Sequence, residues 1–280
     1  MQRIMPPAMR QIVAETGLVV DGIRPVSRDR VSPKWEFATA VSDDGVTLNM
    51  SISENYAKIR REIPDYVTIV VSCKTRTTEE IREIIDAGAT DIGENYVQEA
   101  GQMYSVLKKD ATKVKWHMIG SLQTNKINKA LRTFDVIQTI DSLGMAVAID
   151  RRVERTRKQG VPIYIEINIG SEDSKVGIKL VEHEPFDEYV EKLVRDISRL
   201  EHIRLEGIMT MGPRFGNPED VRPYFRRTKE IFEKIKTLNL PNVDMKYLSM
   251  GMANSCMVAI EEGSNMVRIG TAIFGERKYE

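Results

Sequence analysis

The feature that most constrains this chain is a repeated alternation, after residue 50, of short apolar runs and amphipathic segments. The apolar runs are Val67–Ser72, Asp91–Gly93, Val114–Ile119, Val136–Ile140, Ile163–Ile169, Leu205–Met211, Lys246–Met250 and Met266–Ile269. Several are rich in β-branched residues and continuously apolar, as strands of a parallel sheet buried on both faces must be. Eight such strands alternating with helices over about 230 residues predict an α/β protein, a single (β/α)8 barrel of the TIM type.

An open, doubly wound sheet is the structural alternative to the barrel. Its usual nucleotide-binding version has no support, because no G-x-G-x-x-G motif follows the first strand. Capping residues predict where two helices begin. Ser53 is expected to cap a helix that runs through Ile63, and Thr77 with Glu80 forms a capping box for a helix that Gly88 ends.

The first 50 residues differ from the rest of the chain. They contain Pro6, Pro7, Pro25 and Pro33, and they show one hairpin signal, in which 37–41 and 46–50 flank a Ser-Asp-Asp-Gly turn. We therefore divide the chain into an N-terminal extension, 1–50, either a hairpin or partly disordered, and a barrel domain, 51–280.

Composition excludes several classes of partner. Lys plus Arg and Asp plus Glu number 41 each, so the net charge is zero and we expect neither a nucleic acid nor a membrane as partner. The longest stretch without a charged residue, 247–260, is too short to cross a bilayer. Two cysteines predict no disulfide framework, which fits a cytoplasmic location, and three scattered histidines show no metal-ligand spacing.

Polar residues follow or end the predicted strands. In a barrel of this type the carboxyl ends of the strands form one mouth, where the chemistry of such proteins is found. The residues placed there are Lys74, Asn95, His117, Thr139, Asp141, Asn168, Met209, Thr210, Ser249 and Arg268. Their convergence predicts a small polar ligand.

Lys74 is the candidate nucleophile among these residues. Read alone, it is most simply a solvated loop lysine. The functional interpretation is an amine that forms a Schiff base with an aldehyde, which requires a deprotonated nitrogen. Desolvation and a nearby cation, for which Arg268 is the candidate, would favour that form.

Two glycine-containing segments follow the last two strands. They are Leu248–Met252, with Ser249 and Gly251, and Arg268–Ala272, with Gly270 and Thr271. Phosphate sites of TIM barrels often lie in these two loops, where glycine lets the backbone approach the anion and hydroxyl groups donate to it. The alternative is that both glycines only shape turns.

Three other residues have ordinary structural interpretations. His117 lies among apolar neighbours and is more often a hydrogen-bonded core histidine than a ligand contact. Asn95 could be a helix N-cap, and Cys73 is more simply a small buried thiol than a reactive one.

With these motifs in view, the chain resembles the pyridoxal 5'-phosphate (PLP) homeostasis protein family, also described as proline synthase co-transcribed or alanine racemase N-terminal-domain-like. The matching segments, which span about 51–277, are Val71–Thr75, Gly93–Glu99, Trp116–Lys126, Asp173–Gly177, Gly207–Pro213, Leu248–Met252 and Met266–Gly275. The family usually has serine where this chain has Cys73.

The resemblance implies a fold-type III PLP barrel with PLP as its cofactor. It implies that Lys74 carries the Schiff base and that Arg268 faces the pyridine nitrogen. The positions implied to bind the phosphate are Ser249, Gly251, Gly270 and Thr271. Those implied to line the cofactor are Asn95, His117 and Met209.

The function expected from the resemblance is PLP binding in vitamin B6 homeostasis without dedicated catalysis, with apo-PLP enzymes as candidate recipients and with the protein a monomer or a homodimer. A guanidinium facing the ring leaves the pyridine neutral, and a neutral ring is a weak electron sink. The alternative is an amino-acid racemase of the alanine racemase type, which needs an acid or base on each face of the substrate. We see no second, β-rich domain after Arg268 to supply the opposing tyrosine. A third hypothesis is an aldolase that uses Lys74 without a cofactor.

Overall fold

The structure is a computed structural model that describes residues 39–41, 47–49, 51–156, 160–173, 176–179, 185–213 and 216–276. Of the predicted N-terminal extension, only β1 (Thr39–Val41) and β2 (Thr47–Asn49) are described. They pair antiparallel with Thr39 opposite Asn49, which confirms the predicted hairpin. The remainder of that extension lies outside the described residues.

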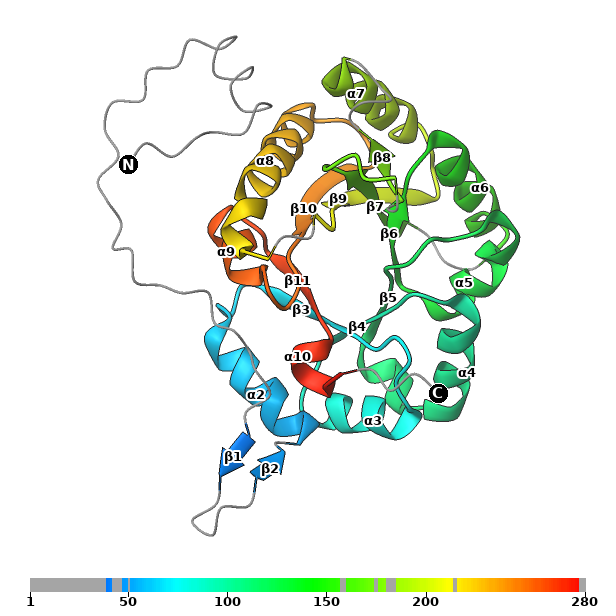
Figure 1. The fold of residues 1–280 in the computed structure, drawn as a ribbon. Helices are drawn as coiled ribbons and strands as arrows, with labels where there is room; N and C mark the ends of the chain where they lie inside the picture. Colours follow the sequence, from blue (N-terminus) through cyan, green and yellow to red (C-terminus); the bar gives the residue numbers. More distant parts are fainter. Residues whose placement is uncertain are drawn as a thin grey trace, which may run out of the picture. The chain divides into compact units, whose positions relative to one another are not determined.

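Eight parallel strands form a closed ring, as predicted (Figure 1). They are β3 (Thr68–Ser72), β4 (Asp91–Glu94), β5 (Lys115–Met118), β6 (Val136–Ile140), β7 (Val161–Asn168), β9 (Ile203–Met209), β10 (Val243–Ser249) and β11 (Met266–Ile269). The ring closes because β11 pairs with β3 and β6 pairs with β7, so the open sheet is excluded. A short ninth strand, β8 (Ile178–Lys179), pairs with the end of β7 and was not predicted.

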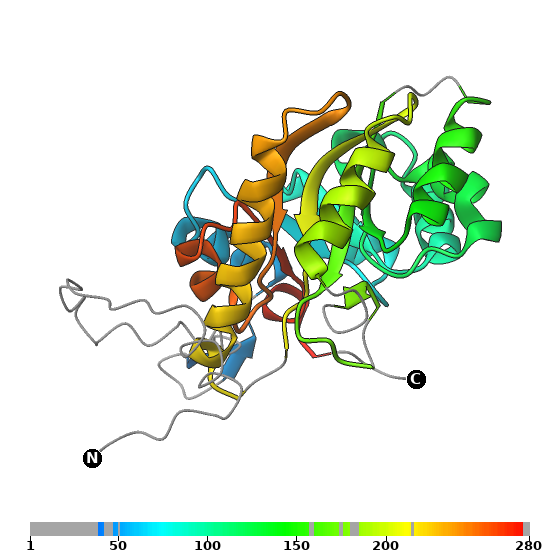
Figure 2. The same ribbon diagram turned by 90° about the horizontal axis from the view of Figure 1, so that it is seen from above.

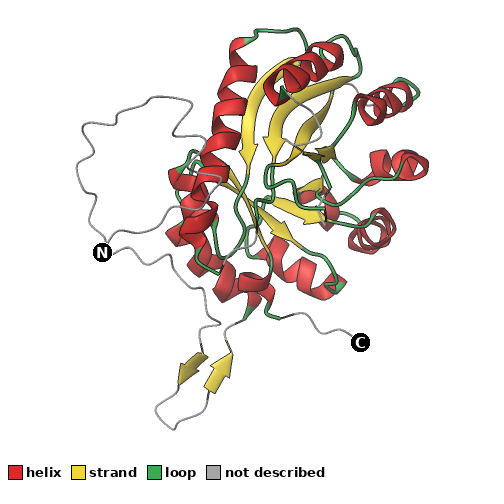
Figure 3. Ribbon diagram, turned by 45° about the horizontal axis from the view of Figure 1, so that its top comes forward, coloured by secondary structure: helices red, strands yellow, loops and turns green. Residues whose placement is uncertain are grey.

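Helices follow the strands and surround them (Figure 3). They are α2 (Ile52–Glu62), α3 (Thr78–Asp86), α4 (Val97–Leu107), α5 (Ile127–Thr133), α6 (Leu143–Val153), α7 (Phe186–Ile197), α8 (Arg222–Thr237), α9 (Cys256–Glu261) and α10 (Thr271–Phe274). Turns of 3-10 helix occur at Asp110–Lys113, Thr124–Lys126 and Pro218–Val221. The view from above shows the long α8 beside the strands (Figure 2). Within the described ranges, every helix is too short or too polar to span a lipid bilayer.

The two predicted helix starts had different outcomes. α3 begins as predicted, with a capping box between Thr77 and Glu80, and Gly88 follows its end with φ of +96°. The predicted start of α2 was wrong, because the N-cap is Ser51 and not Ser53. Ser51 has a glutamate three residues later, Glu54, which completes a capping box, whereas Ser53 donates from its hydroxyl to Glu83 on α3 at 3.0 Å.

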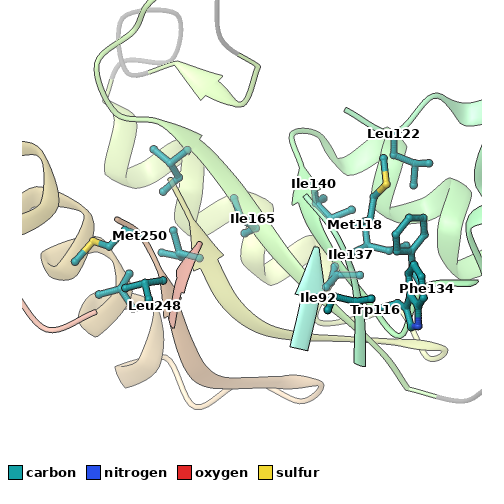
Figure 4. Packing of buried hydrophobic residues seen from close by; sticks show 14 of the residues in the cluster. Ile92, Trp116, Met118, Leu122, Phe134, Ile137, Ile140, Ile165, Leu248 and Met250 are labelled. Atoms are coloured by element: carbon teal, nitrogen blue, oxygen red, sulfur yellow. The ribbon is translucent and has the colours of Figure 1, made fainter. Parts of the chain in front are cut away.

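The main core lies between the ring of strands and the ring of helices. Trp116, Phe134, Ile92 and Ile137 pack together on one side of it (Figure 4). A smaller cluster fills the inside of the barrel. Its members are Val70, Val136, Tyr164, Met209 and Met266, all buried. Each fully buried side chain of this size stabilises the fold by about 1.5–3 kcal/mol, so the barrel interior is a packed layer that supports the mouth from below.

Candidate functional site

A cavity of about 600 Å3 lies at the carboxyl ends of the strands. Its described lining consists of Ser72, Lys74, Asn95, Ile119, Met211, Met252, Ala253, Asn254, Arg268, Gly270 and Thr271. These residues come from the ends of β3, β4, β5, β9 and β11 and from the loop after β10. The mouth predicted from the sequence is therefore a real cavity, and it is of the size that holds a small molecule.

Lys74 enters the cavity just after β3. It is half-buried. Its Nζ lies 5.0 Å from the centre of the ring of Tyr96, which is the N-cap residue of α4. Side chains alternate along a strand, so Ser72 and Lys74 line the cavity while Cys73 between them is fully buried. Burial raises the pKa of the Cys73 thiol well above its usual range. Cys73 is thus the inert buried thiol that its ordinary interpretation predicts.

Arg268 is the buried cation of the site. Its Nη1 donates to the carbonyl and hydroxyl oxygens of Ser249 at 2.9 and 2.7 Å, and its Nη2 donates to the carbonyl of Thr210 at 2.8 Å. Burial lowers the pKa of Arg268 to about 10, against the opposing effect of Glu166, so the guanidinium remains protonated at neutral pH. The side chain is only 5% exposed and therefore presents a fixed positive charge to the cavity.

A chain of hydrogen bonds beneath the cavity holds Arg268. His117 Nε2 lies 2.8 Å from Asp91 Oδ1, and His117 Nδ1 lies 2.8 Å from Gln138 Nε2. Ser249 donates to Gln138 Oε1 at 2.8 Å and accepts from Arg268. If the Gln138 amide donates to Nδ1, the histidine carries its proton on Nε2 and donates to Asp91. His117 is therefore a hydrogen-bonded interior histidine.

Glycines allow close approach of the backbone around the mouth. A Cβ on Gly270 would lie 3.0 Å from the carbonyl oxygen of Ser72, so this residue lets the start of α10 pack against β3. A Cβ on Gly120 would lie 2.7 Å from the Cα of Asn95. Gly120 thereby fixes the position of Asn95, whose side chain makes no hydrogen bond to another described residue.

The structure brings together five of the nine predicted site residues. Lys74, Asn95, Arg268, Gly270 and Thr271 line the cavity. His117 and Ser249 lie below it in the hydrogen-bond chain, and Met209 lies in the buried interior cluster. Gly251 also lies outside the lining. It has φ of +96°, and its carbonyl accepts from the N–H of Arg268, so it shapes the turn that holds Arg268.

The other polar residues assigned to strand ends are also engaged outside the lining. The hydroxyl of Thr139 donates to the carbonyl of Gly120, and that of Thr210 donates to the carbonyl of Ile167. The side-chain amide of Asn168 donates to the carbonyl of Glu172 and accepts from its N–H. Asp141 accepts from the hydroxyl of Ser142. These side chains therefore fix the loops around the mouth.

Two buried glutamates near the mouth were not predicted. Glu94 ends β4 and is fully buried, with no hydrogen bond to either carboxylate oxygen. Burial, with the negative charge of Glu99, raises the pKa of Glu94 to about 8. Glu166 on β7 is 4% exposed, and burial raises its pKa to about 7 although Arg268 acts to lower it. The sequence signal for Glu166 was an acidic residue within the largely apolar run Ile163–Ile169, whereas Glu94 follows Gly93 and has no such signal.

The fold and the mouth define a (β/α)8-barrel protein with a lysine and a buried arginine at the carboxyl ends of its strands. The family model described as "Alanine racemase, N-terminal domain" matches residues 50–278. Alanine racemase from Clostridium difficile has the same fold, with a TM-score of 0.65 at 14% identity, covering 82% of this chain and 60% of that chain.

Closer similarity comes from proteins named pyridoxal phosphate homeostasis protein. The one from Aquifex aeolicus is 39% identical over 206 residues, which are 74% of this chain and 85% of the relative. The one from Escherichia coli is 36% identical over 244 residues, 81% of this chain and 97% of the relative. PipY of Synechococcus elongatus, solved with PLP bound, has a TM-score of 0.71 and 26% identity and covers 80% of this chain and all of its own. This chain belongs to the pyridoxal phosphate homeostasis protein family.

Proposed function

We propose that this protein binds PLP as a Schiff base on Lys74 and acts in vitamin B6 homeostasis, without dedicated catalysis. The observation that carries the proposal is that one cavity brings together three kinds of group. They are the amine of Lys74, the buried guanidinium of Arg268 and the turn formed by Gly270 and Thr271. An aldehyde, a pyridine nitrogen and a phosphate are the three groups that such a set would hold. PipY, with the same fold, is a PLP-bound relative.

The residues present fit the cofactor. The Thr271 hydroxyl is exposed and makes no hydrogen bond to another described residue, and Gly270 leaves its backbone accessible at the start of α10, so both suit a phosphate. Arg268 cannot give up its proton at neutral pH, and its three hydrogen bonds to Ser249 and Thr210 keep it in place. It would donate to a ring nitrogen and keep that nitrogen unprotonated.

The make-up of the lining supports a carrier over a racemase. PLP supplies an electron sink for carbanion chemistry when its ring nitrogen is protonated, and Arg268 would oppose that protonation. Racemisation also needs an acid or base on each face of the substrate. Apart from Lys74, the described lining holds no second amine, carboxylate, imidazole or phenol. We infer that the protein stores PLP in the cytoplasm and passes it to apo-enzymes.

Reduction with borohydride followed by peptide mass spectrometry tests the proposal. The protein incubated with PLP should carry one pyridoxyl group, on the peptide that contains Lys74. The Lys74→Ala variant should carry none, while Lys109→Ala, which removes an exposed lysine after α4, should be labelled like the parent. A label on another lysine in the parent protein would overturn the assignment. Rapid turnover of alanine or serine by the PLP-loaded protein would favour the racemase.

A further inference from the structure

A second cavity, of about 610 Å3, lies between α5 and α6 on the outside of the barrel. Its described lining is Asn128, Leu131, Arg132, Arg151, Arg152, Arg155 and Thr156. It shares no residue with the cavity at the mouth. Arg132 lies in the last turn of α5, and Arg151 and Arg152 lie in the last turn of α6. Because each helix runs back from the mouth, these ends lie at the opposite face of the barrel (α5 and α6 in Figure 1).

The four arginines of this cavity have no acidic partner in the described part of the chain. Within the described ranges none of them takes part in an ion pair, whereas all four arginines of α7 and α8 do. The nearest acidic residues in the sequence are engaged elsewhere or exposed. Asp135 accepts from the N–H of Trp116 at 3.0 Å, Asp150 accepts from the N–H of His202 at 2.8 Å, and Glu154 lies outside the lining.

Stabilisation of the helix ends does not account for this arrangement. One cation in the last turn is sufficient to interact with a helix dipole. Arg132 can do so at the end of α5, and Arg152 does so at the end of α6 by donating to the carbonyl of Ala148 at 2.7 Å, so Arg151 and Arg155 are in excess. Arg132, Arg151 and Arg155 are exposed, and their side chains make no hydrogen bond to another described residue. Holding like charges around one hollow costs free energy unless an anion is bound there.

We propose that this cavity binds a compact anion with several phosphate groups. Guanidinium groups match phosphate oxygens with paired hydrogen bonds, and four of them face one hollow. The volume falls within the range of about 300–1,000 Å3 that is typical of small-molecule sites, which favours a small anion over a protein partner. Among the described residues, the lining contains no aromatic ring on which a nucleobase would stack, so the phosphates carry the recognition.

Calorimetric titration with inorganic tripolyphosphate tests the proposal. The parent protein should bind it with a component that is weakened by about tenfold or more in Arg132→Gln/Arg155→Gln, because two of the four charges are lost. The matched control is Arg61→Gln/Lys236→Gln, which removes two exposed cations from the last turns of α2 and α8 and should change the affinity by less than about twofold. Equal weakening in both variants, or no effect in either, would overturn the proposal.

A second measurement needs no variant. Tripolyphosphate should protect Arg132, Arg151 and Arg155 of the parent protein from modification by phenylglyoxal, read by peptide mass spectrometry, and should leave Arg61 reactive. Failure to protect them would contradict the proposal. Binding of polyglutamate but not tripolyphosphate, lost in the Arg132→Gln/Arg155→Gln variant, would replace it with an acidic protein partner. Because the two cavities are separate, neither result depends on PLP binding at the mouth.

Discussion

Replacing Glu94 with glutamine should make the protein more stable, and increasingly so as the pH rises from 5 to 8. Glu94 is fully buried, and neither carboxylate oxygen makes a hydrogen bond. Burial raises its pKa from 4.5 to about 8, with a contribution from Glu99. The unfolded chain releases this proton above about pH 4.5, whereas the folded protein keeps it up to about pH 8. The free energy of unfolding of the parent protein therefore falls as the pH rises between these two pKa values. Glutamine does not titrate, so the variant avoids this loss.

The size of the effect follows from the linkage between proton binding and folding. One unit of pKa difference corresponds to about 1.4 kcal/mol, so the parent protein loses at most about 3 kcal/mol between pH 5 and pH 7 through Glu94. Urea unfolding followed by circular dichroism, at several pH values between 5 and 8 and without ligand, measures the difference between the two proteins. Glu79→Gln, an exposed change on α3, is the control and should give a difference that does not vary with pH. A pH-independent difference for Glu94→Gln would refute the reasoning.

Three further predictions concern the mouth. Lys74→Ala should abolish the visible absorption band of bound PLP but leave weak, phosphate-dependent binding, measured by equilibrium dialysis; an unchanged band would mean that another lysine reacts. Arg268→Glu should shift the absorption of bound PLP and lower stability by about 3 kcal/mol, because the partners of a buried charged group are left unpaired, and spectroscopy with thermal melting checks both effects. Gly120→Ala should weaken PLP binding by about tenfold, because its Cβ displaces Asn95, whereas Gly144→Ala, with open space around the new Cβ, should bind like the parent protein.

The strands and the presence of a mouth could be predicted from the sequence because both depend on local patterns. Short runs rich in β-branched residues, such as Val136–Ile140, mark strands that are buried on both faces, and β6 has these bounds in the structure. The lysine after β3 and the glycine turn after β11 lie in the cavity because strand ends in a closed barrel converge.

The depth of each residue below the mouth could not be predicted. It depends on the register between strands, which tilt in a barrel, and register is set by pairing across the whole ring. Ser249 lies opposite Met209 and Met266 in the neighbouring strands. At this depth its hydroxyl group contacts Gln138 and Arg268 and does not reach the cavity. Gln138 was missed for the same reason, since nothing local to β6 shows that its amide meets His117 from β5.

The most direct test of the central claim is a crystal structure of this protein after soaking with PLP. The account predicts continuous electron density from Lys74 Nζ to the carbon of the former aldehyde, with the ring nitrogen next to Arg268 and the phosphate at Gly270 and Thr271. Density for PLP at any other lysine, or a phosphate held away from the start of α10, would contradict it.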